Sequence, residues 1–356
     1  MRHVSLFALL IFLGTGLFAQ QDAQFSFYPY NQQFLNPAYT GTSNNSKFTL
    51  LYRDQWFSVQ NGAVNKLTPH SVSANLDLRL RDGRYGFGAV MHFDHVGYSM
   101  MGTINPSFSF IIPTKGMTKV SLGLQASLMM FDDRRERAVL DQEADPVFND
   151  LPMRFYPNAG AGIYIYDNDR YYVGLGVPNI LNWNISESVF GDGGGLHNAA
   201  TNQFFARQYR HYFVHAGMMF PRWSNASTVH YLPSILLKIV EFNDRGGSEV
   251  QVPDIDITNR LIFLQRYTLG VGVRLGGDRV GPYFESVIGM FTVMLGKNSD
   301  FAHEIGAAYD YTLSDLNDID NFSIGSLEFM YKIRFGSQRA FTNTAPDGQY
   351  LNISPF

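Results

Sequence analysis

Apolar residues occupy every second position in several long stretches of this chain. Between residues 71 and 80, Val72, Ala74, Leu76, Leu78 and Leu80 alternate with polar side chains, and residues 119–128 and 326–335 follow the same pattern. Because successive side chains of a β-strand point to opposite faces, each stretch predicts a strand with one apolar and one polar face. An antiparallel sheet on a soluble core and a barrel in a membrane both show this alternation.

The length of the segments favours the membrane. They exceed the five or six residues usual in soluble sheets. A strand of about 11 residues tilted near 40° rises roughly 28 Å, which matches the apolar band of an outer-membrane barrel. We therefore predict an all-β chain that forms a transmembrane antiparallel β-barrel of about 14 strands over residues 47–336. The strands are predicted near 47–56, 69–80, 85–94, 103–112, 118–131, 154–166, 170–177, 207–219, 229–241, 248–258, 260–275, 280–295, 302–312 and 325–335. The stretch 260–275 is long enough for two strands.

Aromatic residues and glycines support a closed barrel. Aromatics make up 15% of the chain, and many lie near segment ends, where barrels carry interfacial girdles, as do Tyr85, Phe93, Phe155, Tyr171, Tyr311 and Phe335. Glycines recur on the predicted inner face, at Gly86, Gly88, Gly160, Gly162, Gly174, Gly176, Gly270 and Gly272. Inward glycines are typical of a strongly coiled or tightly filled barrel.

The connections between predicted strands alternate in length. Short ones at 82–83, 114–116 and 167–169 have tight-turn residues, whereas long ones span about 132–153, 178–206 and 313–324. In membrane barrels the short turns face the periplasm and the long loops face the exterior. The two ends of the predicted barrel are therefore distinguishable.

The chain ends carry different signals. Residues 1–19, a short positive start and an apolar run shorter than a membrane span, predict a cleaved signal peptide. Residues 20–46 lack alternation and are predicted to plug the lumen or to lie in the periplasm as a contact surface. Residues 337–356 are predicted to form a polar tail.

Composition narrows the class of protein. The chain has no cysteine, so an exported form must be stabilised by burial or by closing the sheet. Its formal net charge of −4 argues against a nucleic-acid partner. A soluble secreted sheet protein remains an alternative, which detergent-free solubility would support.

Short motifs near both ends of the mature chain form a recognisable set. The first group is Gln24-Phe25-Ser26, Asn36-Pro37-Ala38-Tyr39-Thr40-Gly41 and Arg53-Asp54-Gln55-Trp56. The second is Tyr309-Asp310 within residues 305–311, followed by Gly325-Ser326-Leu327-Glu328-Phe329. This set resembles the PorP/SprF family of the type IX secretion and gliding apparatus, over essentially the whole mature chain. Ala307, Ala308 and Leu327 depart from the family pattern.

The resemblance implies a non-enzymatic barrel in the cell outer membrane. Its partners would be outer-membrane lipid, other type IX secretion components and an exported surface protein, bound through that protein's C-terminal sorting domain. The motif residues are then candidate partner contacts: Gln24, Phe25, Asn36, Pro37, Ala38, Tyr39, Gly41, Arg53, Gln55, Trp56, Tyr309 and Asp310.

Structural roles are open for the same residues. Asn-Pro favours turn initiation, so Asn36 and Pro37 are equally interpreted as a turn that seats the first strand. Arg53 shares a strand face with Gln55, and a lumenal ion-pair network is the favoured interpretation of Arg53.

Catalytic and metal-binding patterns give no convincing assignment in the sequence. His211 and His215 would lie about 13 Å apart on a strand, too far to bind one metal. The acidic residues 315–320 lack the ligand spacing of a calcium loop, and no Gly-x-Ser-x-Gly elbow occurs. We predict no catalytic residue, no metal and no cofactor. The main alternative function is a passive outer-membrane porin or small-molecule transporter, which would need an open lumen.

Overall fold

A computed structural model describes most of the predicted barrel. The described residues are 24–55, 68–80, 83–97, 99–133, 153–184, 207–223, 227–244, 247–250, 253–277, 282–296, 301–313 and 325–335. The predicted signal peptide, the polar tail and Trp56 lie outside these residues.

Fourteen described strands form one closed antiparallel ring, as predicted. They are β1 (Ser46–Asp54), β2 (His70–Arg79), β3 (Tyr85–Val96), β4 (Ser99–Pro113), β5 (Lys119–Asp133), β6 (Arg154–Asp167), β7 (Tyr171–Val177), β10 (Arg210–Met218), β11 (Val229–Asp244), β13 (Asp254–Phe263), β14 (Tyr267–Gly277), β15 (Pro282–Leu295), β16 (Phe301–Thr312) and β17 (Ser326–Phe335). Three short strands lie outside the ring: β8 (Trp183–Asn184), β9 (Arg207–Gln208) and β12 (Gly247–Val250).

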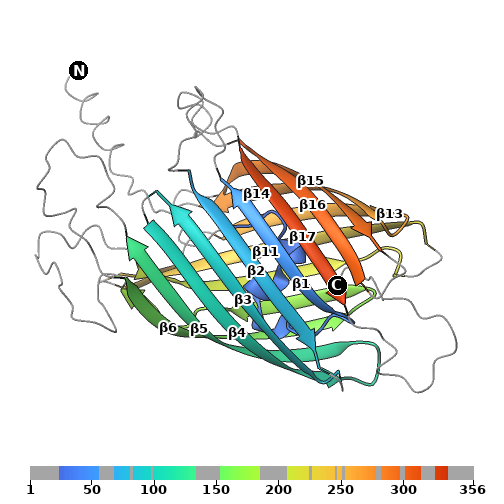
Figure 1. Cartoon of the computed structure of the whole chain (residues 1–356), viewed down its shortest axis with the longest axis horizontal. Helices are drawn as coiled ribbons and strands as arrows, with labels where there is room; N and C mark the ends of the chain where they lie inside the picture. The colour runs from blue at the N-terminus through green and yellow to red at the C-terminus, as the bar shows by residue number, and fades with distance from the viewer. Residues whose placement is uncertain are drawn as a thin grey trace, which may run out of the picture.

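Pairing between β1 and β17 closes the ring. Ser46 pairs with Phe335 and Asp54 with Leu327, so the first and last strands lie side by side along their whole length (Figure 1). β10 joins β7 to β11 on the other side. The ring therefore has no free sheet edge, which is the arrangement that satisfies backbone hydrogen bonds within a bilayer.

The alternation places polar residues inside the ring and apolar residues outside. On β2 the polar Ser71, Ser73 and Asp77 are buried, whereas on β5 the outward Leu124 is 66% exposed. The outer wall is a belt of exposed Leu, Ile, Val, Phe and Tyr side chains. This inside-out arrangement is expected of a barrel whose apolar face contacts lipid.

One strand division differs from the prediction. The sequence predicts strands at 248–258 and 260–275, but the structure has β13 at Asp254–Phe263 and β14 at Tyr267–Gly277. The turn between them uses Leu264 and Gln265, both at φ 53°. Because neither is the Gly, Asn or Asp that usually occupies such positions, the turn has no local sequence signal.

The connections divide the barrel into two ends. Short turns lie at the end where β1 begins, and most of the long connections lie at the opposite end, as the alternation in length predicts. Residues 97–98 and 278–281 are short connections at the long-loop end. The helical elements among the described residues are too short to cross a membrane as apolar spans.

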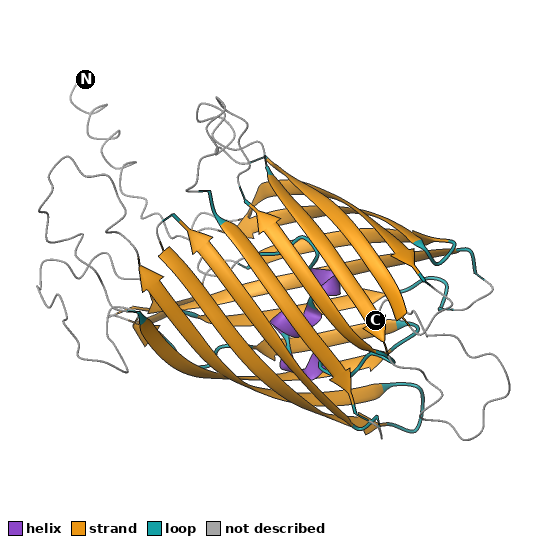
Figure 2. Ribbon diagram, in the orientation of Figure 1, coloured by secondary structure: helices purple, strands orange, loops and turns teal. Residues whose placement is uncertain are grey.

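Residues 24–45 lie inside the ring, and we call them the lumenal segment. It contains a 3₁₀ turn η1 (Tyr28–Tyr30), a short helix α2 (Gln32–Leu35) and a second 3₁₀ turn η2 (Pro37–Tyr39). Figure 2 shows these helical turns enclosed by the strands. Nearly all of its side chains are buried, although they are largely polar or aromatic. The segment starts near the long-loop end and runs towards the short-turn end, where β1 begins.

Candidate functional site

Glu328 on β17 holds the start of the lumenal segment. Its two carboxylate oxygens accept hydrogen bonds from the backbone amides of Ser26 (2.8 Å) and Phe27 (2.9 Å). Glu328 is buried, and it points inwards because the polar positions of β17 face the lumen. A buried carboxylate that accepts two amide hydrogens forms charge-assisted bonds, which are stronger than neutral ones.

A chain of buried ion pairs extends from this contact along the wall. Arg53 donates to the Ser26 hydroxyl at 3.1 Å and pairs with Asp310 at 3.0 Å and Glu328 at 3.5 Å. Arg274 also pairs with Asp310, at 2.9 Å, and binds Asp256 with two nitrogens at 2.9 and 3.1 Å. Each carboxylate is satisfied by a neighbouring guanidinium, which offsets the desolvation of buried charge.

Gln24 connects the segment to the far end of this chain of charges. Its amide nitrogen donates to Asp256 at 3.2 Å. Gln24, Ser26 and Phe27 are therefore held by side chains from β1, β13 and β17, all near the long-loop end of the barrel.

Tyr28 and Tyr30 continue the segment into the lumen. The Tyr28 hydroxyl donates to Ser234 at 3.3 Å, and burial raises the pKa of Tyr28 to about 12. The Tyr30 ring contacts two basic side chains, with Lys332 Nζ 4.4 Å and Arg260 Cζ 5.1 Å from its centre. These contacts attach the aromatic part of the segment to β11, β13 and β17.

Asn36 organises the second turn of the segment. Its side-chain oxygen accepts from the Ala38 amide at 2.9 Å and so caps η2, where Pro37 takes the first helical position. Its side-chain nitrogen donates to the carbonyl of Ile163 on β6 at 3.0 Å. Asn36-Pro37 therefore forms a capped turn that is fixed directly to the barrel wall.

Glycines on the inner wall make room for this turn. A Cβ added at Gly123 would overlap the backbone of Pro37 and Ala38, and one added at Gly162 would overlap the Asn36 side chain. At Gly176 an added Cβ would overlap the Leu35 carbonyl. Together with Gly86, which faces Thr40, these residues form a trough on β3, β5, β6 and β7, and we call it the glycine trough.

Gly88 and Gly174 also face the lumenal segment, since a Cβ added at Gly88 would overlap the Gln33 side chain and one added at Gly174 would overlap the side chains of His215 and Asn36. The remaining predicted inner glycines have different neighbours. A Cβ added at Gly160 would meet the carbonyl of Pro178, and one at Gly270 would meet Met290. Gly272 lies near Ile257 and Thr258. These positions face the wall or a connection, so they do not belong to the glycine trough.

Polar contacts fasten the last part of the segment to the short-turn end. Gly41, at φ 70°, donates its amide hydrogen to Asp77, which also pairs with Lys47 at 3.3 Å. Lys47 donates to the Tyr39 hydroxyl and lies over the Tyr39 ring, 4.2 Å from its centre. Gly41 is required here because a side chain at this φ would be strained and would overlap Gly86.

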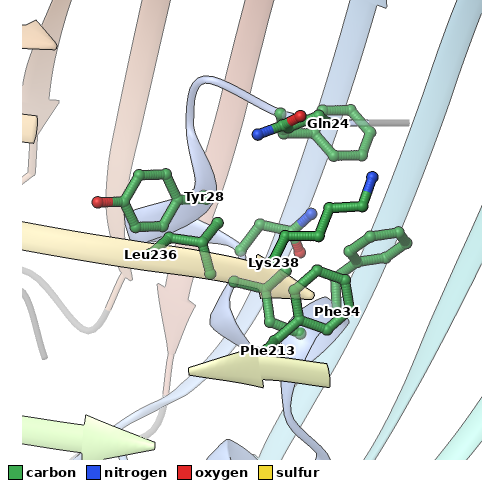
Figure 3. Close-up of a pocket in the computed structure, with 9 residues that line it drawn as sticks. Gln24, Tyr28, Phe34, Phe213, Leu236 and Lys238 are labelled. Carbon is green, nitrogen blue, oxygen red and sulfur yellow. The ribbon is translucent and has the colours of Figure 1, made fainter. Parts of the chain in front are cut away.

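A narrow cavity separates the segment from the wall at β10 and β11. Gln24, Tyr28 and Phe34 of the segment line it together with Phe213, Leu236 and Lys238 of the wall (Figure 3). Its empty volume is about 360 Å³, which includes space open to solvent.

Most of the motif residues predicted from the sequence meet inside the lumen. Phe25, Asn36, Pro37, Ala38, Tyr39, Gly41, Arg53 and Asp310 are buried there, and Gln24 is partly buried at its start. Tyr309 points the other way, with 38% of its surface exposed on the outer wall. Gln55 follows β1 and donates its backbone amide hydrogen to the Pro69 carbonyl at 2.8 Å.

Several residues that complete the site are absent from the predicted set. They are Glu328, Arg274, Asp256 and the trough glycine Gly123, whereas Gly176 is among the glycines predicted on the inner face. Glu328 has a signal in the sequence, since it occupies the polar face of a strand with clear alternation. The sequence signal for Arg274 and Asp256 is weaker, because only their ion-pair partners in the structure distinguish them from other polar strand residues.

The chemistry of this arrangement is that of a fixed chain segment. The acidic groups pair with guanidinium groups or accept amide hydrogens, and in the described part of the chain no group of three or more His, Asp or Glu side chains is placed to hold a metal ion. What the geometry does is hold residues 24–45 across the lumen.

Comparison with known proteins identifies a family. A family model described as "Type IX secretion system membrane protein PorP/SprF" matches residues 17–333. The comparison with curated proteins gives no match.

Solved outer-membrane structures are similar in fold. The CymD monoaromatic hydrocarbon channel is 12% identical, with a TM-score of 0.46 over 86% of this chain and 91% of that one. The P. putida toluene transporter TodX is 9% identical, with a TM-score of 0.40 over 84% and 90%. Omp33 of Acinetobacter baumannii is 6% identical, with a TM-score of 0.38 over 84% and 100%. Similarity at this level concerns the fold and gives no information about what this chain binds.

Proposed function

The chain belongs to the PorP/SprF family of type IX secretion system membrane proteins, and from this premise we propose that it binds an exported protein through that protein's C-terminal sorting domain. It is an outer-membrane barrel of the secretion system. In the proposed role it performs no catalysis. The barrel holds the partner at the membrane during secretion or surface attachment, including in the gliding apparatus.

The observation that carries the proposal is the occupied lumen. Residues 24–45 cross the interior and bond to strands on opposite walls, through Tyr28 to β11, Asn36 to β6 and Gly41 to β2. A protein partner therefore meets this barrel at its two ends, where the connections lie. The long-loop end offers more chain for such a contact than the short-turn end does.

The same observation weighs against a passive porin. Passive diffusion needs a continuous water-filled path, whereas residues 24–45 occupy the lumen of the described barrel. The buried motif residues thus support the proposal indirectly, because they fix the segment that closes the path. With the segment in place, Asn36 and Ala38 are fully buried and a partner cannot touch them.

Co-purification tests the proposal. The full-length barrel, tagged and extracted from native membranes in mild detergent, is expected to carry an exported protein, and removal of that protein's C-terminal domain is expected to abolish its capture. Capture that persists without the C-terminal domain would show that the proposed mode of binding is wrong.

Loop replacement locates the contact. A short Gly-Ser linker in place of residues 134–153, at the long-loop end, is expected to weaken capture at least tenfold. The matched control exchanges residues 114–118 for a similar linker at the short-turn end and is expected to leave capture unchanged. The opposite result would place the contact on the short-turn side.

A further inference from the structure

The two halves of the lumenal segment are held by different physical means. Residues 24–31, the first half, depend on charged side chains of the wall, above all Glu328 and the Arg53–Asp310 pair. In residues 36–45, the second half, the stretch from Asn36 to Gly41 lies in the glycine trough, close to wall backbone. The helix α2 lies between them.

We propose that the lumenal segment is a two-part plug in which the first half is a releasable gate and the second half is a fixed seat. In the closed state the gate blocks the lumen towards the long-loop end. Glu328 is its latch, because this one side chain holds two successive backbone amides of the gate. Release opens a path beside the seat without unfolding the barrel.

Packing around the first half allows such a movement. The cavity lined by Gln24, Tyr28 and Phe34 leaves free space beside this half at the β10–β11 wall, where Tyr28 also packs against Phe213 and Leu236. On the other side Phe25 and Phe27 pack with buried wall side chains, and the polar groups there bond to backbone amides and a hydroxyl, which water can replace when the gate leaves.

Packing around the second half of the lumenal segment opposes movement. The Pro37–Ala38 backbone lies so close to Gly123 that a single added methyl group would overlap it. Thr40 bonds Ser107 through its hydroxyl at 2.8 Å and accepts from Ser109 through its carbonyl. The carbonyl of Thr42 accepts from Asn168 at 2.9 Å. These bonds come from β4 and the β6–β7 turn and hold the seat at several points.

Thiol accessibility can distinguish the halves, because the natural chain has no cysteine. Ser26→Cys places a thiol in the gate and Thr40→Cys places one in the seat, and both native residues are almost fully buried. The two variants are purified as full-length folded barrels and treated with a small charged maleimide. We expect Cys at position 26 to react at least about tenfold faster than Cys at position 40, since local opening of one element exposes only its own groups.

Glu328→Gln, introduced into the Ser26→Cys and the Thr40→Cys variants, tests the latch. It keeps the size of the side chain but removes the charge that accepts two amide hydrogens. The labelling rate at position 26 is expected to rise by roughly tenfold, because bonds to a charged acceptor are about twice as strong as neutral ones, while the rate at position 40 stays the same. Equal rates at the two positions, or an equal rise at both, would overturn the proposal.

Conductance gives a second readout that does not depend on the cysteine variants. In planar bilayers the natural protein is expected to be mostly closed, and the protein lacking residues 24–31 is expected to conduct persistently. A barrel lacking residues 24–31 that stays as closed as the natural protein would overturn the assignment of the gate.

Discussion

The two halves of the lumenal segment solve the same problem, holding a polar chain inside a barrel, in opposite ways. The first half meets carboxylates and guanidinium groups from β1, β13 and β17. The second half meets glycines and neutral hydrogen bonds from strands β3 to β7, and its charged contacts are confined to Asp77 and Lys47 near its end. Charged contacts are concentrated at one half and close backbone fit at the other.

The difference predicts how each half responds to mutation. A charged latch fails when one group is removed, because the partner groups are left buried and unsatisfied. A close fit fails when a group is added, because backbone cannot move aside as a flexible side chain can. The halves should therefore be sensitive to opposite kinds of substitution.

Removal of the latch carboxylate should have the largest effect. Glu328→Ala leaves the Ser26 and Phe27 amides without their acceptor and Arg53 without one of its carboxylates. We expect the free energy of unfolding in detergent to fall by about 3–5 kcal/mol. Urea unfolding followed by tryptophan fluorescence measures it.

Glu241→Ala is the matched control for a less buried carboxylate. Glu241 pairs with Arg210 at 3.0 Å near the same end of the barrel, and both side chains are partly exposed. Because solvent screens such pairs, we expect a loss of about 1 kcal/mol. Equal losses at Glu241 and Glu328 would mean that charge does not hold the first half.

Addition of one methyl group to the trough should have the next largest effect. In Gly123→Ala the new Cβ overlaps the Pro37–Ala38 backbone, and we expect a loss of about 1–3 kcal/mol. Gly289→Ala is the control, since a Cβ there has no neighbour within 4 Å and faces outwards. A similar small effect at both glycines in urea unfolding would contradict the close fit of the second half.

The barrel wall could be predicted from the sequence because its rule is local. Alternation alone places Ser73 and Asp77 inside and Leu124 outside, and the strand count follows from repeating this rule. The strand division at Leu264 and Gln265 could not be predicted, because the turn uses residues without turn preference.

The lumenal contacts could be predicted only in part, because they join distant parts of the chain. Ser26 and Glu328 are 302 residues apart, and no local pattern relates them. The favoured interpretation of Arg53, a lumenal ion pair, agrees with its contacts to Asp310 and Glu328. The inner glycines indicated a filled lumen, but which of them face residues 24–45 depends on the register of four strands.

Loss of the turn cap in the second half should lower the free energy of unfolding less than the overlap introduced by Gly123→Ala. Asn36→Ala removes the acceptor for the Ala38 amide and the donor to the Ile163 carbonyl, and we expect a loss of about 1–2 kcal/mol. Asn36→Asp keeps the cap but places a carboxylate against the Ile163 carbonyl. If urea unfolding shows Asn36→Asp to be as stable as the natural protein, the bond to the wall contributes nothing and the cap is sufficient.

The smallest effect is expected at Tyr28, whose neutral bond to Ser234 is the counterpart of the charged latch in the same half. At pH 8, Tyr28→Phe should cost about 0.5–1.5 kcal/mol, the usual value of one hydrogen bond. Burial raises the pKa of Tyr28 from 10.0 to about 12, so its contribution to stability is complete below pH 10 and declines as the pH rises towards 12. The natural protein should therefore lose its advantage over Tyr28→Phe between pH 10 and 12 in urea unfolding, whereas Tyr85→Phe on the outer wall reports alkaline loss common to the whole barrel. A difference between natural protein and Tyr28→Phe that stays constant up to pH 12 would mean that the first half already admits water at Tyr28, and its charged contacts alone would then hold it.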